Sequence, residues 1–176
     1  MTQDPLSLFH EWITTVEMTL ATATADGRPS ARMVLLKAAD ERGFQFCTNY
    51  ESRKGLELLD NPHAALLFRE PDIQVRIEGR VERVDPSESD AYWVTRPPES
   101  RRSAAASRQS QPIGSREELE AAVAAQPAEP PRPPYWGCYR LVPETYEFWR
   151  HRDNRLHERR LFTRRPDGWH ETLLQP

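Results

Sequence analysis

The sequence predicts a single, mostly β domain with peripheral helices (α+β), spanning residues 1–176 and built on an antiparallel barrel. Three observations favour this fold class. The chain has 176 residues, a length that suits one domain. Short runs of β-branched and aromatic residues recur between turn signals such as Asp26-Gly27. Four stretches begin with helix-capping residues, so helices are expected between the strands.

The first 50 residues predict a short helix followed by three strands. Asp4 is suited to cap a helix over residues 5–16, because Pro5 is favoured at the first helical position. The strands are expected at residues 18–25, 31–37 and 44–48. Tight turns separate them, so we expect the three strands to form a meander that starts a β-barrel.

The next predicted helix carries an unusual charge at its start. Ser52 is suited to cap a helix that ends before Asn61-Pro62. Arg53 and Lys54 stand in its first turn, although a helix N-terminus is partly positive and favours acidic neighbours. Free amide groups, the helix dipole and two cations together would hold a phosphate. The alternative is two exposed basic side chains without a role.

The rest of the chain predicts further strands and three helices. Asp85 and Ser115 each open a capping box, in which the cap and an acidic residue three positions later satisfy free amides of the first turn. Strands are expected at residues 64–68, 73–84, 135–142, 145–149, 156–162 and 169–173. Helices are expected at residues 85–95, 99–108 and 115–125.

Residues 155–159, Arg-Leu-His-Glu-Arg, form a cationic segment near the C-terminus. In a strand, side chains alternate between faces, so Arg155, His157 and Arg159 would project the same way. Cations on one face repel one another unless an anion, such as a phosphorylated ligand, covers them. Histidine also exchanges a proton near neutral pH. The alternative is a solvated basic edge strand, because charge runs usually face water.

Composition excludes several classes of protein. The net charge of −3 and the pI of about 6.0 give no electrostatic case for nucleic-acid binding. Two cysteines, Cys47 and Cys138, are too few and too dispersed to predict a disulfide framework or a zinc site. Charges interrupt every apolar run, so we expect no membrane span and a cytoplasmic location. The mean hydropathy of −0.78 is low, which favours further apolar burial against a second subunit or a cofactor.

Several short motifs follow one another in order along the whole chain. They are Asp4-Pro5-Leu6, Arg32 to Lys37, Thr48-Asn49, Ser52-Arg53-Lys54, Gln74, Tyr92, Arg96, Ser100, Ser107 to Ser110, Glu147-Phe148-Trp149 and Arg155 to Arg159. Each motif is weak alone, but the ordered set is specific. Together they resemble the pyridoxamine 5′-phosphate oxidase family of FMN flavoproteins. The resemblance implies an FMN-binding split β-barrel, antiparallel and Greek-key-like, that forms a homodimer with FMN at the interface.

The resemblance also implies roles for individual residues. Those implied to contact the FMN cofactor are Arg32, Met33, Val34, Leu35, Leu36, Lys37, Cys47, Thr48, Arg53, Lys54, Gln74, Gln109, Ser110, Trp149 and Arg159. Those implied to bind the substrate are Lys37, Tyr92, Arg96, Ser100, Arg155 and His157. Arg155 and His157 are implied to lie against the substrate ring and to take part in the chemistry. Cys47 stands where members of the family generally have tyrosine.

Two of these residues pose a geometric question. Arg32 and Lys37 are an odd number of residues apart, so a regular strand would put them on opposite faces. Either one residue meets FMN and the other meets the substrate, or a bulge lies between them.

The implied activity is FMN-dependent oxidation of pyridoxamine 5′-phosphate and/or pyridoxine 5′-phosphate to pyridoxal 5′-phosphate, with O2 reduced to H2O2. The implied partners are a phosphorylated B6 vitamer, O2 and a second copy of the chain. Three alternatives stay open: a related oxidase acting on another aromatic ring, such as a phenazine precursor; a deazaflavin-dependent reductase; and a flavin-binding module without turnover. Tyr92, Arg96 and Ser100, with Lys37, favour a phosphorylated substrate.

Overall fold

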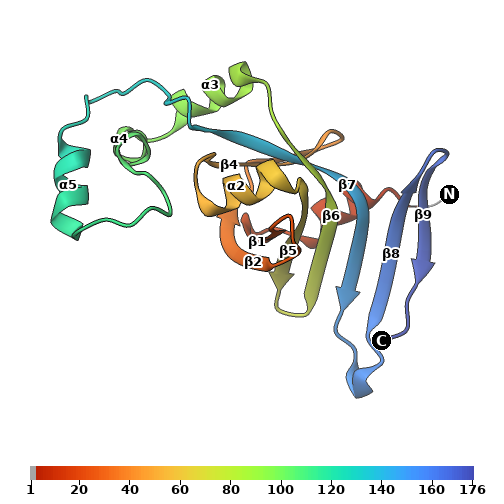
Figure 1. Cartoon of the computed structure of the whole chain (residues 1–176). Coiled ribbons are helices and arrows are strands. Elements are labelled where there is room, and N and C mark those ends of the chain that lie inside the picture. The colour runs from red at the N-terminus through yellow and green to blue at the C-terminus, as the bar shows by residue number, and fades with distance from the viewer. Residues whose placement is uncertain (1–2) are drawn as a thin grey trace.

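The computed structural model describes residues 3–176 as a curled antiparallel sheet with helices around it (Figure 1). The helices are α1 (Pro5–Trp12), α2 (Arg53–Asp60), α3 (Pro86–Thr95), α4 (Pro98–Ala106), α5 (Arg116–Ala124) and the short 3-10 helix η1 (Asp153–Arg155). The strands are β1 (Glu17–Ala23), β2 (Pro29–Leu35), β3 (Ala38–Asp40), β4 (Gly43–Asn49), β5 (His63–Glu70), β6 (Ile73–Arg83), β7 (Trp136–Arg150), β8 (Glu158–Arg165) and β9 (Gly168–Leu173). The predicted fold class, mostly β with peripheral helices, is confirmed.

The sheet order is β2-β1-β5-β6-β7-β4-β3, with β8 and β9 extending from β7. The expected meander is wrong in its third strand, because β4 pairs with β3 and β7 and not with β2. The chain crosses between the two edges of the sheet after β2. There the amide of Leu36 donates to Val16 O, beside β1, and the amide of Lys37 donates to Gln45 O in β4. These two hydrogen bonds connect the two edges of the sheet, which is curled into a half barrel.

Strand β7 replaces the two strands expected at residues 135–142 and 145–149. It continues through Pro143 because the register with β6 shifts between Glu78 and Gly79, which leaves room for a residue without an amide hydrogen. A side chain at Gly79 would clash with the carbonyl oxygen of Val142. The bulge keeps β7 in one piece, and one strand thereby spans the whole molecule.

The prediction of a strand from Arg155 to Arg159 is wrong over its first half. Asn154 and Arg155 have positive φ angles of 57° and 64°, and β8 begins only at Glu158. The physical reason is the reversal after β7, because Glu158 must return beside Arg150 to pair the two strands. Arg155 and His157 therefore lie in the connecting turn and do not share a strand face with Arg159.

The capping residues act as expected. Asp4 accepts a hydrogen bond from the amide of Ser7 at 2.8 Å, and Ser115 accepts one from the amide of Glu118 at 3.2 Å. Helix α1 ends at Trp12, four residues earlier than expected. Among residues 3–176 no helix has the length and apolarity that a bilayer crossing requires. The cytoplasmic location stays a prediction.

Two apolar clusters stabilise the fold. In the larger one, Phe9 of α1 packs edge to face against Phe44 of β4 and Phe68 of β5, with ring centroids 4.9 Å apart in both pairs. Full burial of one such ring contributes roughly 1.5–3 kcal/mol. The smaller cluster contains Val84, Trp93, Trp136 and Cys138. It lies between α3 and β7, and its Trp136 also lines a cavity beside α4.

Candidate functional site

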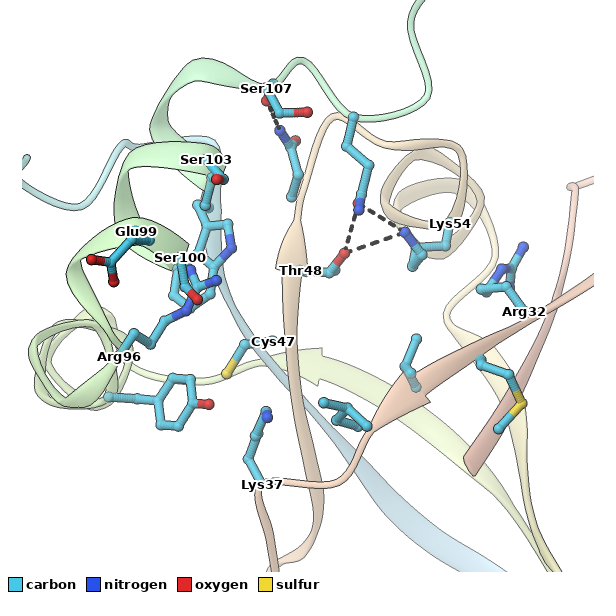
Figure 2. Close-up of a pocket in the computed structure, with 18 residues that line it drawn as sticks. Arg32, Lys37, Cys47, Thr48, Lys54, Arg96, Glu99, Ser100, Ser103 and Ser107 are labelled. Carbon is cyan, nitrogen blue, oxygen red and sulfur yellow. Dashed lines mark hydrogen bonds between the residues drawn. The ribbon is translucent and has the colours of Figure 1, made fainter. Parts of the chain in front are cut away.

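A cavity of about 690 Å³ lies between α4 and strands β2 and β4 (Figure 2). Most of the residues predicted to hold a cofactor or a substrate line it. They are Arg32, Met33, Val34, Leu35, Lys37, Cys47, Thr48, Lys54, Tyr92, Arg96, Ser100 and Gln109. The structure thus brings together motifs that are spread over 78 positions of the chain, from residue 32 to residue 109.

One end of the cavity contains Lys54, which lies in the first turn of α2 and is only 8% exposed. Its Nζ donates to Gln109 Oε1 at 2.9 Å, to Ser52 Oγ at 3.2 Å and to Thr48 Oγ1 at 3.3 Å. All three acceptors are neutral. Burial, together with the nearby charge of Arg32, lowers the pKa of Lys54 to about 8. A buried cation with only neutral partners is suited to an anionic ligand.

Arg32 lies near Lys54 at the same end, and Glu57 fixes its direction. The buried carboxylate of Glu57 accepts hydrogen bonds from Arg32, Ser30 and Thr22, and Arg32 also donates to Leu20 O at 3.1 Å. Burial alone would raise the pKa of Glu57. The hydrogen bonds from Ser30, Thr22 and Arg53 and the positive charge of Arg32 outweigh burial and lower it to about 2.

The other end of the cavity contains Arg96, just after α3. Its guanidinium stacks on the rings of Trp136 and Trp93, at 4.6 and 5.2 Å from the ring centroids. Within residues 3–176 the buried Nη1 of Arg96 has no hydrogen-bond partner, and burial lowers the pKa of the group. Lys37 Nζ lies 5.5 Å from the centroid of the Tyr92 ring. A second cationic site therefore exists, which aromatic rings hold in place.

The two cationic ends face each other across strand β4. Figure 2 shows Lys54 and Arg32 on one side, Arg96 and Lys37 on the other, and Cys47 and Thr48 between them. Arg32 and Lys37 line the same cavity despite their odd spacing, because β2 ends at Leu35 and Lys37 lies in the break before β3. The alternation rule for a regular strand does not extend across that break.

Three of the predicted site residues lie near the cavity without lining it: Leu36, Arg53 and Ser110. Arg53 is exposed, and its Nε donates to Glu57 Oε1 at 2.9 Å. Ser110 follows Gln109 and has a positive φ of 73°.

The other predicted site residues lie far from the cavity of their own chain: Gln74, Trp149, Arg155, His157 and Arg159. Gln74, Trp149 and Arg159 are in register across β6, β7 and β8, and the His157 ring packs on Trp149 with centroids 4.7 Å apart. Figure 1 shows this end of the sheet well away from α4. We call these five residues the distal group.

The sequence assigned no role to several residues of the site, although Asn49 and Ser107 stand within its motifs. Asn49, Glu99, Ser103, Ala104, Ser107 and Trp136 line the cavity, and Glu57 lies behind it. The spacing of Arg53 and Glu57 by four residues in a predicted helix is a signal for an ion pair. No local signal connects Glu57 to Arg32, because that contact depends on how α2 packs against β1 and β2.

The half-barrel and the cavity with cations at both ends define a protein whose cavity is suited to anionic ligands. Comparison with known proteins identifies the family. The model of the pyridoxamine 5′-phosphate oxidase family matches residues 14–126, and that of the pyridoxine 5′-phosphate oxidase C-terminal dimerisation region matches residues 136–176. The chain belongs to the pyridoxamine 5′-phosphate oxidase family. It is therefore an oxidoreductase-type flavoprotein that carries the family's dimerisation region.

Individual relatives agree with this assignment. The chain is 58% identical over 166 residues to a pyridoxine/pyridoxamine 5′-phosphate oxidase of Paraburkholderia phymatum, covering 90% of this chain and 78% of the relative. It is 50% identical over 189 residues to the protein of the same name from Rubrobacter xylanophilus, covering 98% and 87%.

Two solved structures show the same fold. PhzG from Burkholderia lata 383, in complex with tetrahydrophenazine-1-carboxylic acid, matches with a TM-score of 0.91 and 35% identity, over 99% of this chain and 94% of that one. A pyridoxamine 5′-phosphate oxidase-related, FMN-binding protein of Nostoc punctiforme matches with a TM-score of 0.78 and 20% identity, over the whole of both chains. The FMN-binding split β-barrel predicted from the sequence is confirmed.

Proposed function

We propose that the protein uses FMN to oxidise pyridoxamine 5′-phosphate and/or pyridoxine 5′-phosphate to pyridoxal 5′-phosphate, with O2 reduced to H2O2. One observation carries this proposal. Lys54 and Arg96 lie at opposite ends of one cavity, and neither forms an ion pair with a carboxylate within residues 3–176. Two separated cations suit two separate phosphates, one on the cofactor and one on the substrate. The names of the relatives that are 50–58% identical support the same activity.

The residues at the Lys54 end fit FMN. Lys54 and Arg32 would hold its phosphate, and the free amides of α2 add positive potential at the same point. The apolar side chains of Met33, Val34 and Leu35 would line the flavin ring. FMN, when bound, supplies the two-electron acceptor for the reaction. The protein supplies the binding, the orientation and the electrostatics.

The residues at the Arg96 end fit the substrate phosphate. Arg96 can donate two parallel hydrogen bonds to a phosphate, and its stacking on Trp136 and Trp93 fixes the plane in which they point. Lys37, Tyr92 and Ser100 would complete the grip. Holding a remote phosphate lowers the entropic cost of placing the reacting carbon beside the flavin.

We further propose that the distal group completes the site from a second subunit, in a homodimer with FMN at the interface. The distal residues other than Gln74 fall within the matched dimerisation region, residues 136–176. Apolar side chains on both surfaces support this arrangement. Met33 and Leu35 beside the cavity are 62% and 47% exposed, and Leu156 in the β7–β8 turn is 70% exposed. Arg155 would stabilise developing negative charge, and His157 would orient the ring or move a proton.

A second candidate function rests on the solved structure of PhzG, which was obtained with tetrahydrophenazine-1-carboxylic acid. Arg96 and Lys37 can pair with a carboxylate as well as with a phosphate. A related oxidase acting on a phenazine-type ring is therefore the alternative. A carboxylate has fewer oxygen atoms than a phosphate, so under this alternative the ligand would need fewer hydrogen-bond donors at the Arg96 end. Tyr92 and Ser100 also line the cavity there.

Anaerobic flavin reduction distinguishes these functions. The purified holoprotein is mixed without oxygen with pyridoxamine 5′-phosphate, pyridoxine 5′-phosphate, unphosphorylated pyridoxine or a reduced phenazine carboxylic acid, and the visible flavin absorbance is followed. We expect rapid bleaching with a phosphorylated vitamer and slow bleaching with pyridoxine. Rapid bleaching by the phenazine compound alone would establish the alternative function. Bleaching by none of the four would indicate a flavin-binding module without turnover.

A further inference from the structure

Cys47 and Cys138 form a cysteine pair in the wall of the cavity. They lie directly opposite each other on the neighbouring strands β4 and β7, and the structure joins their sulfurs in a disulfide. The sequence predicts no disulfide framework from two such dispersed cysteines, yet one disulfide is present, because the sheet makes adjacent two positions that 91 residues of sequence separate. Directly opposite residues of an antiparallel pair project from the same face of the sheet, so the two side chains are neighbours whether or not the bond is present.

The two cysteines differ in access. Cys47 is half-buried and lines the cavity, whereas Cys138 is fully buried in the cluster with Trp93 and Trp136. The backbone of Cys138 is held on both sides, because its amide donates to Ser89 Oγ at 3.0 Å and its carbonyl accepts from Tyr50 Oη at 3.3 Å. An oxidant in the cavity therefore reaches Cys47 first, and Cys138 is a fixed partner behind it.

The charges around Cys47 favour reaction. Figure 2 shows its sulfur on the side of the cavity where Arg96 and Lys37 lie. Neighbouring cations stabilise a thiolate, which is the form of cysteine that attacks peroxide. If the proposed oxidase function holds, H2O2 forms inside this same cavity.

We propose that Cys47 and Cys138 are a peroxide-oxidisable dithiol, with Cys47 as the attacking and Cys138 as the resolving cysteine. The Cys47 thiolate attacks one oxygen of H2O2, the O–O bond breaks, and hydroxide leaves, giving a sulfenic acid at Cys47. The Cys138 thiol then displaces the hydroxyl group as water and forms the disulfide. In sum, two thiols and one H2O2 give one disulfide and two waters. The source of the peroxide rests on the proposed function, whereas the chemistry of the pair does not.

Counting thiols in the holoprotein tests the pair without any mutation. The protein is reduced with dithiothreitol, desalted under argon and treated with reagent H2O2 at a small molar excess. It is then denatured in N-ethylmaleimide and weighed by mass spectrometry. We expect two alkylated cysteines before peroxide, none after it, and two again after a second reduction. Two alkylated cysteines after peroxide, or a product that dithiothreitol does not reverse, would overturn the proposal.

Single variants test the order of attack. In Cys138→Ser the sulfenic acid at Cys47 has no partner, so dimedone should trap it, whereas in Cys47→Ser the buried Cys138 should stay alkylatable. Dimedone labelling of Cys138 but not Cys47 would overturn the assigned roles. A final arm replaces reagent H2O2 with aerobic turnover on pyridoxamine 5′-phosphate. Loss of thiols with reagent H2O2 but not with turnover would contradict the proposed function as the source of peroxide. The proposal that the two cysteines are a peroxide-oxidisable dithiol would still hold.

Discussion

Glu57 and Arg32 form an ion pair behind the cavity, with 3.1 Å between Glu57 Oε2 and Arg32 Nη2. The carboxylate belongs to α2, and the arginine belongs to β2. One contact therefore ties the helix that carries Lys54 to the strand that carries Arg32, and it sets the spacing of the two cations that face the proposed FMN phosphate.

Replacing this carboxylate should destabilise the protein in a pH-dependent way. Glu57→Gln keeps the shape of the side chain but removes its charge, so we expect the free energy of unfolding at pH 7 to fall by about 1.5–3 kcal/mol. The folded pKa of Glu57, about 2, lies below the value of roughly 4.3 for an unfolded glutamate. Its stabilisation is therefore fully present above pH ~4.3 and is lost as the pH falls towards 2.

Urea denaturation of both proteins at pH 7 and at pH 3 measures this effect. The difference between wild type and Glu57→Gln should shrink at the lower pH. Glu51→Gln, which changes an exposed carboxylate just before the cap of α2, is the matched control and should alter stability by less than about 0.5 kcal/mol. An equal loss of unfolding free energy in the two variants would mean that the buried ion pair contributes no more to stability than an exposed carboxylate does.

Binding of FMN should weaken above pH 8. In the protein without FMN, Lys54 has a pKa of about 8, and a bound phosphate would favour its protonated form. Binding then takes up a proton at higher pH, so the affinity should fall by up to about tenfold per pH unit above 8. Lys54→Met should lower the affinity at pH 7 roughly ten- to a hundredfold and remove this pH dependence.

Flavin fluorescence titrations between pH 7 and 9.5 give these affinities. Riboflavin, which has no phosphate, is the control ligand and should bind independently of pH in this range.

The protonation of Lys54 also affects the stability of the protein without FMN. The pKa of Lys54 is about 8 in the folded protein and about 10.4 in the unfolded chain. Between these two pH values the unfolded chain binds more protons than the folded protein, so the free energy of unfolding should rise from pH 8 to pH 10. A flat FMN affinity up to pH 9.5 would remove Lys54 from the phosphate site.

Arg96→Ala should raise the KM for a phosphorylated vitamer without releasing FMN. Loss of a charge-assisted contact costs about 1.5–3 kcal/mol, which corresponds to a ten- to hundredfold rise in KM. Unphosphorylated pyridoxine has no such contact to lose, so its kcat/KM should change little. Arg108→Ala, which changes an exposed arginine just after α4, is the matched control and should leave both substrates unaffected. If the phosphorylated vitamer keeps its full advantage in Arg96→Ala, the substrate site lies elsewhere.

Local signals were sufficient for most of the fold. Helix caps depend on contacts three residues apart, and Asp26-Gly27 turns the chain within a hairpin, so Asp4, Ser52 and Ser115 mark their helices correctly. The motifs at Arg32, Lys54 and Arg96 were also found from the sequence, and the structure brings them to one cavity.

Signals that depend on distant parts of the chain were missed. The pairing of β4 with β7 aligns Cys47 with Cys138, and the packing of α2 places Glu57 beside Arg32. Neither relation has a fixed spacing in the sequence. The sequence predicts a strand at Arg155 because strand-forming stretches flank it, residues 147–149 before it and residues 161–163 after it. The need to reverse after β7 decides the backbone there instead.

Mixed dimers should show whether each site draws on two chains. One chain carries Lys54→Met, which damages its own cavity, and the other carries Arg155→Ala, which damages its own distal group. If the distal group of one chain completes the cavity of the other, the mixed dimer has one intact site and one doubly damaged site. Activity is measured at FMN and substrate concentrations just sufficient for the wild type. Under these conditions we expect each parent homodimer to have little activity, and the mixed dimer, purified through two different affinity tags, to reach about half of the wild-type rate. The matched control pairs Lys54→Met with Arg96→Ala. Both changes fall in the cavity, so neither site of that dimer is intact, and its activity should stay at the level of the parents.

Absence of recovery in the dimer of Lys54→Met and Arg155→Ala would mean that Arg155 acts within its own chain or not at all. The proposed site across the interface would then be wrong.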